Sequence, residues 1–238
     1  MVKKVSRRIV KVVITIFCLN LLLAAINYVP TETSESDAFV FRSILKLEQQ
    51  NGVLSYSQEI DLIKKVQHHL SFLVRVGEPI PEYKSREPFD LVKQGSGLCY
   101  DRSRLNDKIF SWLGFRTRHV YILYSEDPST GARLSFMGAL FRRGIASHAV
   151  TEVKTQRGWV LIDSTSEWIS VAKDDDPVDA DHIPEAEHQF TTIPGYFVNR
   201  PYWAIRGLYS RRGHLYRPYF IMYPQANWFD LFSWLIFG

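Results

Sequence analysis

Apolar residues follow several different periods along this chain, and the longest apolar run comes first. Residues 9–29 are interrupted only by Lys11, Thr15, Asn20 and Asn27. Because about 20 helical residues at about 1.5 Å each cross a hydrocarbon core of about 30 Å, this run predicts one membrane-spanning helix. A cleavable signal peptide has the same basic and apolar regions and is the competing interpretation. No A-x-A cleavage site follows Ala24-Ala25, which favours an uncleaved anchor.

Helical spacing of apolar residues recurs further along the chain. It covers 37–50, where Asn51-Gly52 ends it, and returns from Ser57 to Leu73, so we expect two helices that pack together. Residues 77–88 hold three prolines and predict a surface loop. Another amphipathic pattern begins near Cys99 and ends at Gly114.

Strand-type runs occupy 115–124, 147–153 and 159–163, and the last two are typical of a hairpin. If Lys154 and Arg157 flank a two-residue turn, His148 lies directly across from Asp163. If the loop has four residues, His148 is the diagonal neighbour of Asp163. Both registers place the two side chains on one face of the sheet, because the side-chain period of a strand is two.

The charge of the chain is concentrated at its start. Its 29 Lys+Arg and 25 Asp+Glu give a formal net charge of +4. Five bases (Lys3, Lys4, Arg7, Arg8 and Lys11) precede every acid, so the chain after residue 11 has 24 bases, 25 acids and a net charge of −1. The positive-inside rule keeps this flank in the cytoplasm. We therefore expect a single-pass protein of the inner (plasma) membrane with its domain on the periplasmic, extracytoplasmic side.

Composition and texture suggest how the rest is organised. With 46% hydrophobic residues the chain is long and apolar enough to fold. We expect a basic flank and anchor (1–30), a short solvated stalk (31–36), a folded domain (37–172), and a C-terminal extension (173–238) that packs on the domain. That extension opens with seven acids in 173–187, expected as an exposed loop, and then has no acid over 188–229.

Cys99 is the residue that points to chemistry. The only other cysteine, Cys18, lies in the apolar run, so Cys99 has no partner outside the membrane, where an unpaired thiol needs burial or a purpose. Gly95-Ser96-Gly97 predicts a flexible turn into a helix whose N-terminus would stabilise a Cys99 thiolate. His148 and Asp163 could supply the base and the orienting carboxylate that such a nucleophile needs.

Cys99, His148 and Asp163 are also metal-ligand types. Close-spaced pairs such as Cys-x-x-Cys or His-x-x-x-His are absent from the sequence, so we expect neither a metal nor a cofactor.

Four linked blocks carry a family resemblance. They are GLCYD (97–101), LGFRTRHV (113–120), HAVTEV (148–153) and WVLIDST (159–165). In order and spacing they resemble the transglutaminase-like superfamily over about residues 90–168. The resemblance implies a papain-related α+β fold, in which a helix bearing Cys99 packs on an antiparallel sheet bearing His148 and Asp163. These three residues would be the nucleophile, the general base and acid, and the orienting carboxylate. Val150 and Ser164 depart from the usual aromatic and proline of the family.

The resemblance implies acyl transfer through a Cys99 thioester, as an amide or peptide hydrolase or an amidotransferase. The substrate expected outside the membrane is a cell-envelope protein, peptide or glycan-linked amide. The backbone N–H of Cys99 is the natural oxyanion donor, and Gln94 is a second candidate or else an ordinary loop residue. The alternative is a non-catalytic binding or scaffold protein of an envelope assembly that keeps the fold.

The arginine- and aromatic-rich tail supports two interpretations. Its aromatics could cover the core while its arginines pair with the acidic loop. Alternatively, the stretch from Tyr196 to Tyr219 forms a wall of the cleft, with Trp203, Arg211, Arg212 and Tyr216 binding a sugar or an anionic group. Similar stretches occur in transglutaminase-like proteins that accompany bacterial surface-polysaccharide production. A nucleic-acid partner is not expected outside the cytoplasm. The apolar end, 228–237, is too short to span a bilayer and would lie on the membrane or on the core.

Overall fold

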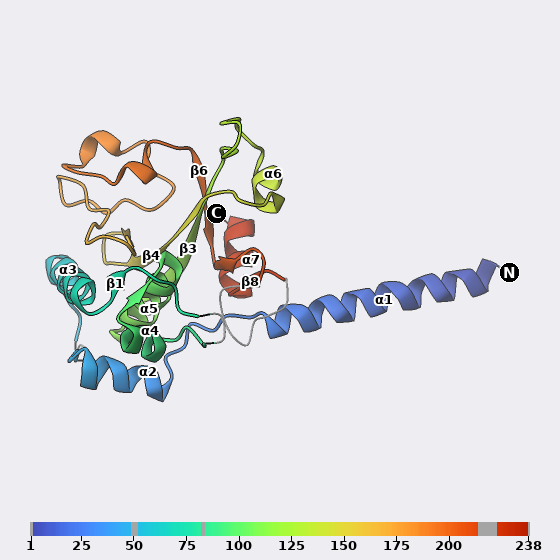
Figure 1. Cartoon of the computed structure of the whole chain (residues 1–238), viewed down its shortest axis with the longest axis horizontal. Coiled ribbons are helices and arrows are strands. Elements are labelled where there is room, and N and C mark those ends of the chain that lie inside the picture. The colour runs from blue at the N-terminus through green and yellow to red at the C-terminus, as the bar shows by residue number, and fades with distance from the viewer. Residues whose placement is uncertain (1, 49–51, 82–83, 214–222, 238) are drawn as a thin grey trace.

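A computed structural model of the chain describes residues 2–48, 52–81, 84–213 and 223–237. One long helix projects from a mixed α/β domain (Figure 1). The helices are α1 (Val2–Ile26), α2 (Glu35–Phe39), the π-helical turn η1 (Val40–Ile44), α3 (Tyr56–Leu73), α4 (Pro88–Gln94), α5 (Cys99–Trp112), α6 (Phe136–Phe141), the 3-10 turns η2 (Glu187–Gln189) and η3 (Gly195–Phe197), and α7 (Trp228–Phe237). The strands are β1 (Arg75–Val76), β2 (Ser96–Gly97), β3 (Arg116–Tyr124), β4 (Ser147–Lys154), β5 (Trp159–Ile162), β6 (Tyr202–Arg206), β7 (Leu208–Ser210) and β8 (Gln225–Ala226).

The central sheet has four strands in the order β5-β4-β3-β6, and all neighbours are antiparallel. Two short pairs accompany it, parallel β1-β2 and antiparallel β7-β8. Strand β6 belongs to the C-terminal extension and pairs with β3 inside the sheet. The expected boundary at residue 172 therefore does not separate the folded domain from an extension that merely packs on it.

The β4-β5 hairpin has the longer of the two expected loops. Lys154 pairs with Trp159 and Val153 with Val160, and the backbone N–H of Thr155 donates to the carbonyl of Gly158 at 2.8 Å. This register makes His148 the diagonal neighbour of Asp163. The sequence-based expectation of a shared sheet face is confirmed, and the four-residue alternative is the one observed.

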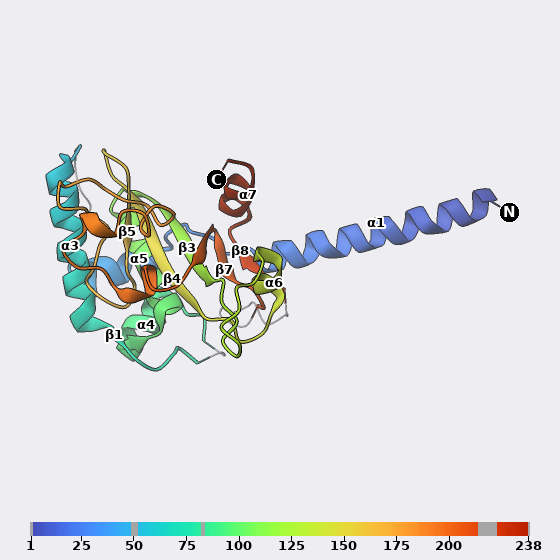
Figure 2. The same cartoon turned by 90° about the horizontal axis from the view of Figure 1, so that it is seen from above.

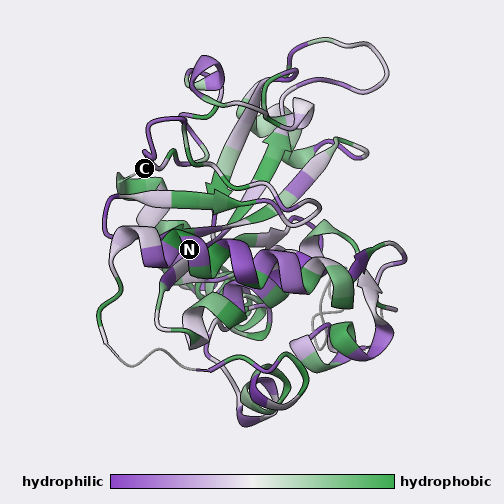
Figure 3. Cartoon of the chain, turned by 90° about the vertical axis from the view of Figure 1, so that its left-hand side faces the viewer, coloured by the Kyte–Doolittle hydropathy of each residue, from purple (hydrophilic) through white to green (hydrophobic). Residues whose placement is uncertain are grey.

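Helix α5 covers one face of the sheet. Its Ser103 hydroxyl lies 3.0 Å from Nδ1 of His119 on β3 and 3.1 Å from the hydroxyl of Thr151 on β4. Helices α3 and α5 and the η1 turn share one apolar cluster with β4 and β5. Figure 3 shows hydrophobic stretches on both the strands and the helices. The core therefore sits between the sheet and α5.

The acidic segment covers the opposite face of the sheet rather than standing free in solvent. Ala180 and Ile183 are fully buried and belong to the same apolar cluster as Val120 and Ile122 of β3. Charged residues alternate with these buried apolar residues along the segment. The segment was expected to be an exposed loop, and its charged residues are largely exposed, but its apolar residues pack in the core.

The N-terminal helix matches its prediction at the level of length and composition. Residues 8–26 of α1 form a stretch with mean hydropathy 2.6, long and apolar enough to cross a membrane, and none of it is buried against the protein. The helix predicted over 37–50 is shorter than expected, because α2 passes into η1 and the helix ends at Leu45. The sequence over 48–51 is entirely polar and Gly52 follows, so no apolar residue there continues the stripe.

The segment between α1 and α2 is fixed at both ends. The N–H of Val29 donates to Ala226 at 2.9 Å, and Arg104 of α5 donates to the carbonyl of Pro30 at 2.5 Å. Beyond it, the ammonium of Lys108 lies 2.6 Å from the carboxylate of Asp37, with both side chains buried. Residues 31–36 are largely exposed, as expected of a stalk, but α1 runs into the domain with little freedom between them.

Candidate active site

Cys99 is the first residue of α5 and is half-buried. The turn before Cys99 has a defined structure, although the sequence predicted a flexible one. Gly95 caps the C-terminus of α4 with φ 73°, and Ser96 and Gly97 form strand β2, which pairs with β1. A Cβ on Gly97 would come within 2.5 Å of Leu91 Cδ1, so only glycine allows this close approach. The carboxylate of Asp101 accepts from the N–H of Leu98 at 3.1 Å. These contacts fix the position of the first turn of α5 and therefore of the Cys99 thiol.

His148 and Asp163 are joined directly. Nε2 of His148 lies 2.7 Å from Oδ1 of Asp163, and both side chains are buried. Burial by itself lowers the pKa of His148, but hydrogen bonds to Asp163 and Cys99 outweigh it and raise that pKa to about 9. Burial pushes the pKa of Asp163 upwards, yet the bond and charge of His148 bring it to about 2. The pair is therefore an imidazolium–carboxylate pair at neutral pH, with Nδ1 left for the thiol.

The loop that carries Asp163 is held from two helices. The side-chain amide of Gln67 on α3 donates to the carbonyl of Asp163 at 2.5 Å and to that of Ser166 at 2.7 Å. Nε of Arg102 on α5 donates to the carbonyl of Ser164. Because α5 also begins at Cys99, the same helix positions the thiol and the carboxylate loop.

Two aromatic residues of the C-terminal extension enclose His148. The ring of Tyr196 meets the imidazole edge-on with centroids 4.9 Å apart, and Phe197 lies 6.1 Å away. The hydroxyl of Tyr196 donates to Oδ2 of Asp163. The sequence placed Tyr196 only at the start of an aromatic cleft wall. The contact with Asp163 depends on how the extension folds back, and no local pattern indicates it.

Cys99 and His148 open into one cavity of about 230 Å³. Its walls come from the start of α5, from β3 and β4, and from the end of β7 with the two residues that follow it. The lining residues include Tyr121, Ser210, Arg211 and Arg212. A cavity of this size accommodates a small acyl group and leaves the rest of a larger substrate outside.

Arg211 and Arg212 both line the cavity, but the guanidinium of Arg211 is hydrogen bonded to backbone carbonyls outside it. Arg211 donates to the carbonyls of Ala139 at 2.7 Å and Ile145 at 3.2 Å, and to the hydroxyl of Tyr121. Its fork therefore fastens the α6 segment to the sheet. Among the residues that the structure describes, the side chain of Arg212 bonds only the carbonyl of Phe141, from Nη2 at 3.0 Å. Of the two, Arg212 is better placed to meet an anionic or glycan group.

Two other expected residues, Gln94 and Trp203, are described away from the site. The amide of Gln94 donates to the carbonyls of Glu78, Pro79 and Ser96 at 3.0–3.1 Å, so it braces a loop instead of facing the thiol. Trp203 packs edge-on against Phe136, with ring centroids 5.5 Å apart, outside the Cys99 cavity. Both corrections have one cause, because each side chain is satisfied by a neighbour that the sequence pattern does not reveal. Tyr216 lies outside the described residues.

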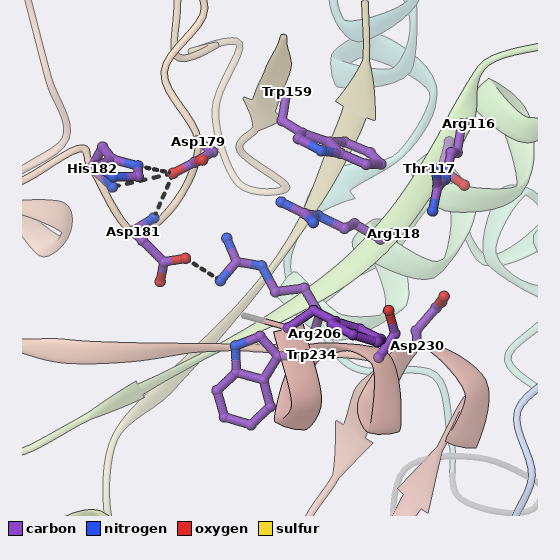
Figure 4. Close-up of a pocket in the computed structure, with 12 residues that line it drawn as sticks. Arg116, Thr117, Arg118, Trp159, Asp179, Asp181, His182, Arg206, Asp230 and Trp234 are labelled. Carbon is purple, nitrogen blue, oxygen red and sulfur yellow. Dashed lines mark hydrogen bonds and ion pairs between the residues drawn. The ribbon is translucent and has the colours of Figure 1, made fainter.

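A larger cavity of about 360 Å³ lies between β3, the 179–182 segment and α7 (Figure 4), and it shares no lining residue with the Cys99 cavity. Its charges are largely paired with one another. Arg206 bonds the carboxylate of Asp181, and His182 bonds that of Asp179 at 2.6 Å. Trp159 covers the guanidinium of Arg118 at 4.0 Å. The ion pair of Arg206 with Asp181 joins strand β6 to the 179–182 segment, so we interpret this cavity as part of a structural interface. Across the residues described, no three His, Cys, Asp or Glu side chains are gathered as metal ligands would be.

Comparison with known proteins finds a distant structural neighbour among the solved structures. No family model matches the chain, and no curated protein matches it. Among solved structures, the chain is similar to an arylamine N-acetyltransferase from Bacillus cereus with a Cys-His-Glu catalytic triad, at 14% identity and a TM-score of 0.35. The match covers 57% of this chain and 51% of that one, so the chain spans about half the length of that enzyme.

Proposed function

We propose that this protein is a membrane-anchored cysteine acyl-transfer enzyme of the transglutaminase-like type, acting on an amide or ester of the cell envelope. The observation that carries the proposal is the buried bond between His148 and Asp163 at 2.7 Å, in a site that opens with Cys99 into one cavity. A thiol at a helix start, an imidazole and an orienting carboxylate are the parts that nucleophilic catalysis needs.

In the first half-reaction, Sγ of the Cys99 thiolate attacks the substrate carbonyl carbon. The carbonyl electron pair moves onto oxygen, and the backbone N–H groups at the start of α5, which have no partner within the helix, are placed to stabilise that oxyanion. The intermediate then collapses, and the bond to the leaving group breaks. His148 gives its Nδ1 proton to the leaving amine or alcohol, and a thioester remains on Cys99.

In the second half-reaction, the neutral His148 takes a proton from water or from an amine, which attacks the thioester carbonyl. Expulsion of Cys99 as thiolate restores the starting ion pair. Water gives hydrolysis and an amine gives transamidation. Asp163 keeps Nε2 protonated throughout, so that Nδ1 always faces the thiol.

The proposed location follows from α1 and from its charged flank. The helix is uncleaved, crosses the inner membrane once, and leaves the basic residues 3–11 in the cytoplasm. A reporter enzyme that is active only outside the cytoplasm, fused after residue 238, should be active. An inactive reporter would overturn the orientation.

The chemistry is tested by the rate of thiol alkylation in the full-length protein. We expect iodoacetamide to modify Cys99 rapidly at neutral pH and His148→Ala to slow this reaction about 10²-fold or more, the usual contribution of a positioned acid or base. His69→Ala, an exposed histidine on α3, is the matched control and should leave the rate unchanged.

Equal, slow alkylation in the parent protein and in His148→Ala would contradict the enzyme and favour a scaffold that keeps the fold. Mass spectrometry separates Cys99 from Cys18, the only other cysteine of the chain. Incubation of the parent protein with envelope extracts, followed by peptide mapping, should show an acyl adduct on Cys99. The mass of that adduct would identify the substrate.

A further inference from the structure

The C-terminal helix α7 has an apolar face that nothing in the described structure covers. Phe229, Phe232 and Ile236 recur at helical spacing and are 77%, 57% and 69% exposed. The one charged residue of α7, Asp230, lines the cavity beneath the helix instead. Exposed aromatic and aliphatic side chains on one face of a helix mark a surface that contacts another apolar phase.

This face cannot rotate into the core. Leu231 and Trp234, on the other side of α7, pack in an apolar cluster with Leu123 of β3 and Ile205 of β6. The helix backbone also lies directly on Gly207, where a Cβ would come within 2.6 Å of the Leu231 nitrogen. The inner face is therefore fixed, and the outer face stays outside.

The start of α7 is bonded to the end of α1. Nε1 of Trp228 donates to the carbonyl of Ala24 at 2.7 Å, within the last turn of α1. Just before α7, Ala226 accepts from Val29 at 2.9 Å and donates to Asn27 at 3.2 Å. Figures 1 and 2 both show α7 at the domain end of α1, on the side from which α1 projects. A bilayer crossed by residues 8–26 would therefore have its surface at the level of α7.

Helix α6 lies beside α7, since the rings of Phe136 and Trp234 have centroids 6.2 Å apart. It also lies towards the domain end of α1 in Figures 1 and 2, and its Met137 and Phe141 are exposed. Arg143 follows and is exposed, as is Arg142, which also pairs with the carboxylate of Asp127 at 2.6 Å. Apolar side chains next to cations match a bilayer interface that contains anionic lipids.

We propose that the face formed by α6 and α7 rests in the headgroup region of the bilayer that α1 crosses, so that the domain has a second contact with the membrane. The proposal commits to lipid as the occupant, because the face is continuous with a helix suited to span a membrane. It rests on α1 being an uncleaved anchor, and it does not depend on the acyl-transfer chemistry.

The test uses the full-length protein in vesicles of equal parts phosphatidylcholine and phosphatidylglycerol. A nitroxide is attached to one cysteine at a time: native Cys18, Phe232→Cys, Ile236→Cys, or Lys65→Cys on the far helix α3, with the other cysteines replaced by serine. Electron paramagnetic resonance then measures access of oxygen, which concentrates in lipid, and of a water-soluble nickel chelate. We expect Cys18 and both α7 positions to favour oxygen several-fold more than Lys65→Cys does.

The outcomes separate the two proposals. Lipid-like Cys18 with water-like labels at both α7 positions would overturn the membrane contact of α7 and leave the anchor intact. A water-like Cys18 would overturn the anchor and this inference with it. Labels on α7 shielded from both reagents would indicate a protein partner instead, and spin–spin broadening there would identify a second copy of the chain.

Discussion

The hydroxyl of Tyr196 donates to Oδ2 of Asp163, while the other oxygen of that carboxylate holds His148 at 2.7 Å. One carboxylate therefore joins a residue of the C-terminal extension to the imidazole beside Cys99. The ring of Tyr196 also lies against His148, so a single side chain restrains both members of the pair. Tyr196 acts as a positioning residue for the proposed reaction.

Removing only that hydroxyl, in Tyr196→Phe, should slow acyl transfer about 10- to 100-fold, because a bond to a charged acceptor contributes about 1.5–3 kcal/mol and about 1.4 kcal/mol is a factor of ten. The Tyr196 bond helps to hold the pKa of Asp163 near 2. The carboxylate is lost as pH falls through that pKa, so the variant should lose activity at a higher pH than the parent. The measurement is the acid limb of the rate–pH profile.

Tyr202→Phe is the matched control for Tyr196→Phe. Its hydroxyl donates to the carbonyl of Ala180 at 2.7 Å, away from Asp163. A shift of the acid limb by the same amount in both variants would show that Tyr196 is merely structural.

The alkaline side of the profile should report His148. Its pKa of about 9 means that the proton needed by the leaving group is present below pH 9 and is lost as pH rises through it. We expect the acyl-transfer rate to fall with a midpoint near 9. In Asp163→Asn the carboxylate that raises this pKa is gone, so the midpoint should move to lower pH. An unmoved midpoint in Asp163→Asn would assign the limb to another group.

Arg211→Lys should destabilise the domain although charge is kept. The guanidinium of Arg211 donates to the carbonyls of Ala139, Leu140, Arg142 and Ile145, and a lysine cannot reproduce that fork. Carbonyls left unpaired cost about 1–3 kcal/mol each when buried. Thermal unfolding in detergent should show the loss. Arg212→Lys, which changes a bond to the carbonyl of Phe141, should stay within about 0.5 kcal/mol of the parent. Equal losses in the two variants would contradict the bracing role of Arg211.

Lys108→Met should be costly because it leaves a buried charge without its partner. The ammonium lies 2.6 Å from Asp37 and 2.7 Å from Glu87, and breaking a buried pair from one side costs about 3–5 kcal/mol. The double variant Lys108→Met/Asp37→Asn should recover part of this loss. Chemical denaturation of the parent, Lys108→Met, Asp37→Asn and the double variant forms a double-mutant cycle. Strictly additive changes in the free energy of unfolding would show that the two side chains do not interact.

The hairpin was the most predictable part of the site. Because side chains alternate along a strand, both candidate registers placed His148 and Asp163 on one face, and the choice of loop length changed only their offset. The start of α5 at Cys99 was predictable for a similar reason, since the glycines before it and Gly114 after it bound one amphipathic run.

The rest of the site depends on contacts between segments far apart in the chain. Tyr196 reaches Asp163 from 33 residues away and Gln67 reaches the same loop from 96, and neither contact leaves a local period. Gln94 and Trp203 had suitable chemistry, yet nearby carbonyls and Phe136 satisfy them. Residue type showed what each side chain could do, and only the folded chain showed which neighbour it met.

The direct junction of α1 with the domain sets a geometric limit on any substrate. Val29, three residues after α1 ends, is already hydrogen bonded to Ala226, so there is no free tether on which the domain could swing. With α1 across the bilayer, the Cys99 thiol stays at a constant height above the lipid. Such an enzyme meets its substrate by lateral diffusion in two dimensions, and it selects for scissile bonds carried at that height over bonds deeper in the envelope.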